Sequence, residues 1–202
     1  MSRSSGSPIE ETLVVFLLVA IVQSVAGVLG VVASLFVLST PLSQHPWTIA
    51  TSVYAHAGLA HLLSNSVALV LFGWPVARAT TRLRFHTFFL VTGAIAGVTQ
   101  VWVTGFFGYG AAVLGSSGAV FALLGYLLVV NPVAESIASS VDVPRWLVWL
   151  VFVSLAAAVT IATASPRAAL VAHFVGFLLG LVAGRARLLQ VDERHPAESV
   201  MA

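Results

Sequence analysis

The chain has 202 residues, of which 59% are hydrophobic and 8% charged, and its formal net charge is +2. A soluble domain carries about 25% charged residues, so lipid must cover much of this protein's surface. All nine basic residues are arginine, and they form no basic run typical of nucleic-acid binding. The absence of cysteine excludes disulfides, thiolate metal sites and a cysteine nucleophile.

Six apolar segments are predicted to be membrane spans. They cover residues 12–38, 57–76, 85–104, 115–130, 146–163 and 168–184. The first is too long for a signal peptide and follows two glutamates, and the fourth ends at Asn131-Pro132, where proline stops a helix. We therefore predict an all-α membrane protein, with a six-helix bundle at residues 12–188 between polar tails at 1–11 and 189–202. No metal, cofactor or nucleic-acid partner is expected.

The arginines orient the predicted bundle, because cytoplasmic loops are enriched in positive charge. Only Arg167 falls on the opposite side from the other eight. Those eight are Arg3, Arg78, Arg82, Arg84, Arg145, Arg185, Arg187 and Arg194. Both termini are therefore predicted to be cytoplasmic, with the loops at 39–56, 105–114 and 164–167 facing outward.

Four polar residues stand out inside predicted spans, where such groups are costly and usually functional or paired. At a rise of about 1.5 Å per residue, Ser117, Asn65 and His173 lie about 18–21 Å above the inner ends of their spans, and His61 about 26 Å. Each alone has a simpler explanation, such as a hydroxyl bonded to its own helix or a side chain that joins two helices. Their shared depth favours one polar site in the outer half of the membrane.

Serine is a weak nucleophile without a base, and histidine is the suitable base near neutral pH. No acidic residue lies in a span at this depth, so only a Ser117–His173 dyad is available. The competing Ser116 points about 100° away from Ser117 on a helix. His61 and Asn65, four residues apart on one helix face, could both donate to an oxyanion, as could free amides near Ser117.

Small residues recur every three or four positions in the fourth and sixth spans, a pattern that lets two helices approach closely. They are Gly118, Ala122 and Gly125 in one span and Gly176, Gly180 and Gly184 in the other. Close contact between these faces would bring the serine and the histidine together.

At this point the chain resembles the rhomboid family of intramembrane serine proteases. The stretch from Gly115 to Gly125 matches the family's GxSG motif and its small-residue continuation, and Ala172 to Gly180 matches its AHxxGxxxG element. His56, His61 and Asn65 match its HxxxxHxxxN pattern, and the loop tryptophan, Trp47, precedes His56 by nine residues. The resemblance covers about residues 12–188.

The resemblance implies a role for each matching residue. Ser117 would be the nucleophile and His173 the general base and then the acid. His61, Asn65 and the Ser117 amide would form the oxyanion hole, and Trp47 and His56 would organise the outer loop. Residues expected to pack around the site are Gly115, Gly118, Phe121 and Gly176. The substrates would be transmembrane segments of other membrane proteins, cut near their outer ends. Separately, the absence of a recognisable targeting segment favours a prokaryotic plasma membrane, and the oligomeric state is left open.

Three features depart from the family pattern. Thr48 follows the loop tryptophan, where arginine is common. The first outer loop is short, so its membrane-lying hairpin is expected to be reduced or absent. Phe121 occupies a position where tyrosine is frequent. The phenylalanine ring could still stack on His173.

Two other classes of function compete with the protease. One is a rhomboid-like protein without catalysis that binds client transmembrane helices in the same cavity. The other is a transporter or haem protein that uses the intramembrane histidines. Transporters usually show inverted repeats, which this sequence lacks, and His61 and His173 differ in depth by about 8 Å, which disfavours paired haem ligands.

Overall fold

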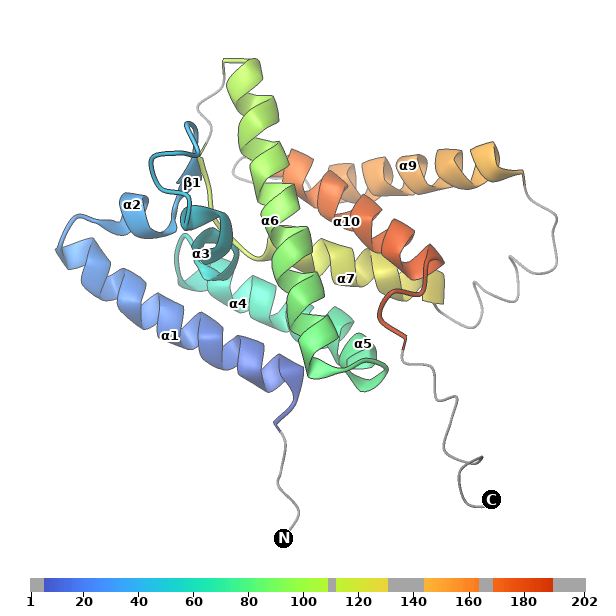
Figure 1. Cartoon of the computed structure of the whole chain (residues 1–202), viewed down its shortest axis with the longest axis horizontal. Helices are drawn as coiled ribbons and strands as arrows, with labels where there is room; N and C mark the ends of the chain where they lie inside the picture. Colours follow the sequence, from blue (N-terminus) through green and yellow to red (C-terminus); the bar gives the residue numbers. More distant parts are fainter. Residues whose placement is uncertain (1–5, 109–111, 131–143, 164–168, 191–202) are drawn as a thin grey trace, which may run out of the picture.

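The computed structural model describes residues 6–108, 112–130, 144–163 and 169–190, and this part of the chain is built almost wholly of helices (Figure 1). Three of them are long and apolar enough to cross a membrane: α1 (Pro8–Val28), α6 (Arg82–Phe106) and the composite helix Leu59–Arg78. Three shorter apolar helices are α7 (Ser117–Val130), α9 (Arg145–Ala162) and α10 (Leu170–Arg185). The predicted helix stop at Asn131-Pro132, the loop 164–167 and most of the C-terminal tail lie outside the described residues.

The predicted bounds of the first span were wrong at both ends. Helix α1 begins inside the predicted tail 1–11, because Ser7 and Glu10 form a reciprocal capping box and Pro8 occupies the first turn. It ends at Val28, and a turn with Gly30 at a φ of +71° separates it from the short helix α2 (Val32–Phe36). The predicted single helix to residue 38 is therefore a membrane-length helix followed by a separate outer segment.

The second span is continuous but irregular. It runs as α4 (Leu59–Ala68), a π-helical turn η1 (Leu69–Gly73) and α5 (Trp74–Arg78). Pro75 has no amide to donate, and a π-helical turn immediately before a proline accommodates the lost hydrogen bond.

The short outer loop is folded rather than extended. It contains strand β1 (Leu38–Ser39) and helix α3 (Thr48–Tyr54), and β1 pairs antiparallel with β2 (Ala112–Val113), just before the GxSG motif. The indole Nε1 of Trp47 donates to the carbonyl of Ser34 at 2.8 Å, and Thr48 Oγ1 donates to the carbonyl of His45 at 2.6 Å. Thr48 is thus satisfied within its own loop.

Helices α7 and α10 form the most extensive contact between elements, and they cross beside the long helix α6 (Figure 1). Their backbones touch: a Cβ at Gly176 would collide with the carbonyl oxygen of Gly118, and one at Gly180 with that of Ala122. Glycine is therefore required at these two positions by close approach.

The starts of α1 and α6 and the chain after α10 meet on one side of the protein. Arg82 forms an ion pair with Glu11 at 2.9 Å, and Arg84 donates to the carbonyl of Gln190 at 2.7 Å. His86 bonds the second carboxylate oxygen of Glu11 at 2.8 Å.

We predict that Gly180→Ala destabilises the protein by about 1–3 kcal/mol, the usual cost of overpacking a tight contact. The matched control is Gly27→Ala, where the new Cβ would lie at an ordinary 3.9 Å from Val32. Thermal or denaturant unfolding in detergent checks both; equal midpoints for the two variants would contradict the inferred backbone contact.

Candidate functional site

The candidate nucleophile lies at the start of a helix. Ser117 is the first residue of α7, and the first helical bond of this turn runs from the Val120 amide to the Ser116 carbonyl at 2.9 Å. The amides of residues 117–119 therefore have no acceptor within the helix, and they carry the positive end of its dipole. Ser117 is partly exposed, whereas its neighbour Ser116 is completely buried.

The turn before Ser117 is shaped by a glycine. Gly115 has a φ of +132°, which residues with side chains rarely adopt, and its amide donates to the carbonyl of Ser52 at 2.9 Å. A Cβ at Gly115 would lie 2.6 Å from Cε1 and 2.9 Å from Nε2 of His61. The absence of a side chain thus lets the His61 ring lie directly against the turn that carries Ser117.

His173 is brought to this turn by the contact between α7 and α10. It is the fourth residue of α10 and is 8% exposed. The ring of Phe121, one turn after Ser117, stacks on its imidazole with centroids 4.3 Å apart and planes 22° apart. Among the described residues no hydrogen bond joins Ser117 to His173, and Nδ1 of His173 is buried without a partner. Catalytic hydrogen bonds are often long in structures without substrate and form in the substrate complex.

His61 is oriented so that one ring nitrogen is free to donate. The Ala57 amide donates to its Nδ1 at 3.3 Å, so the proton of the neutral ring lies on Nε2, the atom beside Gly115. The side chain of Asn65 is buried, and its Nδ2 donates to the His61 carbonyl at 3.1 Å. This bond uses one of the two N–H groups of that amide.

A serine–histidine contact involves the residue before Ser117. Nε2 of His56 and Oγ of Ser116 are 3.2 Å apart, and both side chains are buried. Burial lowers the pKa of His56 to about 4, with a smaller contribution from nearby His61, so His56 is neutral at physiological pH. This bond joins the outer loop to the turn that carries Ser117, and the buried Ser116 hydroxyl is not accessible to a substrate.

Sequence reasoning overlooked two glutamines that contact this site. Gln23 of α1 bonds both backbone groups of His56: its Oε1 accepts from the His56 amide at 3.0 Å, and its Nε2 donates to the His56 carbonyl at 3.3 Å. Gln100 of α6 accepts from the Ala172 amide at 3.0 Å. The available signal was a carboxamide inside an apolar span, which is costly unless it is paired.

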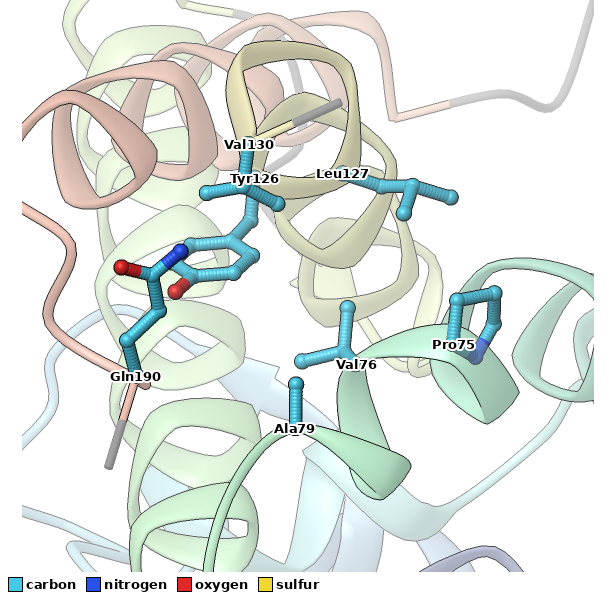
Figure 2. A pocket seen from close by; sticks show the side chains of 7 residues that line it. All are labelled: Pro75, Val76, Ala79, Tyr126, Leu127, Val130 and Gln190. Carbon is cyan, nitrogen blue, oxygen red and sulfur yellow. The ribbon is translucent and has the colours of Figure 1, made fainter. Parts of the chain in front are cut away.

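Two surface hollows lie away from Ser117 and His173. One, of about 290 Å³, is at the other end of α7, where Tyr126 and Gln190 are joined by apolar side chains (Figure 2). Another is lined by residues at the starts of α1 and α6, among them Ser7, Arg78 and Arg82. Neither includes Ser117 or His173, and within the described residues no cluster of histidine and acidic side chains could hold a metal ion.

The fold and this site define a helical membrane protein in which a serine begins one helix and a histidine lies on a second helix packed closely against the first. Residues 43–190 match the model of the Rhomboid domain. The chain therefore belongs to the rhomboid family, as its motifs predicted.

Two bacterial relatives are similar to parts of the chain. It is 34% identical over 82 residues to the putative rhomboid protease YdcA of Bacillus subtilis, an alignment that covers 41% of this chain and 40% of that protein. It is 25% identical over 138 residues to the rhomboid protease GlpG of Haemophilus influenzae, with 68% of each chain covered.

We predict that Ser116→Ala destabilises the protein by about 1–3 kcal/mol, because it leaves the buried Nε2 of His56 unpaired. Ser66→Ala is the control, since Ser66 Oγ bonds only the Leu62 carbonyl of its own helix at 2.8 Å. The unfolding midpoints of both variants, measured in the same detergent, test this prediction. An equal loss of stability in the two variants would show that the bond to His56 contributes nothing to the stability of the protein.

Proposed function

We propose that this protein is an intramembrane serine endopeptidase that cleaves transmembrane segments of other membrane proteins near their outer ends. The observation that carries the proposal is the position of Ser117 at the start of α7, with His173 of the adjoining helix held against Phe121 one turn further on. The rhomboid proteases among its relatives support the same activity.

The proposed reaction follows from the groups at this turn. Ser117 Oγ attacks the carbonyl carbon of the scissile peptide while His173 accepts the hydroxyl proton. His173 then donates this proton to the leaving amine, and water hydrolyses the acyl-enzyme with the same base. The Ser117 amide and the Nε2–H of His61 stabilise the oxyanion, with the free N–H of Asn65 as a third donor.

The proposed topology has six spans, with both termini cytoplasmic in a bacterial plasma membrane. Eight of nine arginines fall on one predicted side, and the ion pair of Glu11 with Arg82 joins the starts of α1 and α6 there. Two of the three shorter helices, α7 and α10, carry Ser117 and His173, and the third, α9, packs against α10, so the site would lie below the outer surface and be open to water from that side.

The activity is tested first by labelling the purified protein with a fluorophosphonate, alongside cleavage of a model transmembrane substrate. Labelling should disappear in Ser117→Ala, and cleavage should fall at least about a thousandfold in Ser117→Ala and His173→Ala. Ser116→Ala should retain labelling, because its hydroxyl is buried.

Each other outcome has a defined meaning. Full cleavage by either dyad variant would refute the protease mechanism. A folded wild-type protein that neither labels nor cleaves, but binds transmembrane peptides equally with and without Ser117→Ala, would favour the client-binding function.

The topology is testable because the chain has no cysteine. In cells with an intact plasma membrane, a thiol introduced by Phe107→Cys should react with a membrane-impermeant maleimide. A thiol introduced by Ala79→Cys should react only after the membrane is permeabilised. Both positions are exposed on the protein surface. The reverse pattern would invert the proposed orientation.

A further inference from the structure

The start of α10 presents an amide that its own helix cannot satisfy. The first helical bond of α10 runs from the His173 amide to the Ala169 carbonyl at 3.0 Å, so the Ala172 amide is the last one without a helical acceptor. Ala169, at the N-cap, has no side chain that could accept from it. In an apolar environment an unpaired amide is costly, so an acceptor from another element is needed.

Gln100 supplies this acceptor from α6. Its Oε1 accepts from the Ala172 amide at 3.0 Å, across 72 residues of sequence. The neighbouring hydroxyls behave differently: Thr99 donates to the Ile95 carbonyl and Thr104 to the Gln100 carbonyl, both within α6. In this stretch of the described chain, Gln100 is the polar side chain whose hydrogen bond leaves the helix.

The bond between Gln100 and the Ala172 amide matters for His173, because no hydrogen bond to the imidazole itself orients this ring in the described part of the chain. Among the described residues its imidazole forms no hydrogen bond, its Nδ1 is buried without a partner, and Phe121 covers one ring face. A serine–histidine–aspartate triad fixes the base through a carboxylate on this nitrogen. Here the direction of the ring depends on packing and on the backbone of the turn that carries it.

We propose that Gln100 is a positioning residue for His173, which acts by holding the first turn of α10 through the Ala172 amide. The inference rests on the proposed protease function. It assigns to α6 the task of placing the base, while the contact of α10 with α7 sets its distance from the nucleophile.

The test compares Gln100→Met, which keeps the length of the side chain but lacks an acceptor, with Gln100→Glu, which keeps an acceptor oxygen. Thr99→Ala is the matched control. The purified full chain is assayed for kcat and KM on a model transmembrane substrate, for unfolding midpoint, and for hydrogen exchange of the Ala172 amide.

We expect Gln100→Met to lower kcat by about 10- to 100-fold with KM within about twofold, since a displacement of about 1 Å has an effect of this size. The Ala172 amide should exchange faster in this variant while the protein stays folded at the assay temperature. Gln100→Glu should recover at least part of the lost kcat, and Thr99→Ala should match the wild type.

The inference is overturned by a wild-type kcat in Gln100→Met, by a loss no greater than the unfolded fraction, or by Gln100→Glu failing to improve on Gln100→Met. A wild-type protein without any turnover would instead refute the proposed protease. Unchanged exchange of the Ala172 amide in Gln100→Met would then still overturn the role of Gln100.

Discussion

The site depends on one contact, in which the backbones of α7 and α10 touch. Gly176 meets the Gly118 carbonyl and Gly180 meets the Ala122 carbonyl, so side chains are excluded from the seam and the helices approach as closely as their backbones allow. In a membrane, where apolar side chains gain little by leaving lipid, such close packing is a principal source of helix association. The same seam sets the separation of Ser117 and His173, so stability and the proposed catalysis have a common physical basis.

Around this seam, polar groups of different segments are joined by hydrogen bonds, and none of these pairs is an ion pair. Gln23 holds the backbone of His56, His56 bonds Ser116, and Gln100 bonds the start of α10. Each bond replaces hydration that the membrane cannot supply, and losing one would leave a buried group unpaired. The network joins α1, the outer loop and α6 to the two turns that carry the proposed nucleophile and base. Helix α1, whose outer face is largely exposed, contacts His56 through Gln23 and through the buried ring of Phe16, whose centroid lies 4.8 Å from that of the imidazole.

The proposed two-residue catalytic site has no acid, so its base would have to be oriented by other means. Here the stacking of Phe121 limits the movement of the His173 ring. The replacement of the family's frequent tyrosine by phenylalanine retains the stacking and removes a hydroxyl that would need a partner. Thr48, in place of the common arginine, satisfies its hydroxyl within the loop, which fits the short outer segment.

The sequence by itself determined the membrane class, the family and the small-residue faces, because composition, hydropathy and motif spacing are local properties that need no knowledge of contacts. It also singled out Ser117, His173, His61 and Asn65, since polar groups in apolar spans are conspicuous. Only the tertiary structure decided that Gln23 and Gln100 pair with backbone groups 33 and 72 residues away, and that Ser116 is buried against His56. It also divided the predicted first span at Gly30. These features depend on which segments become neighbours, and hydrogen bonds between distant segments leave no periodic trace in the chain.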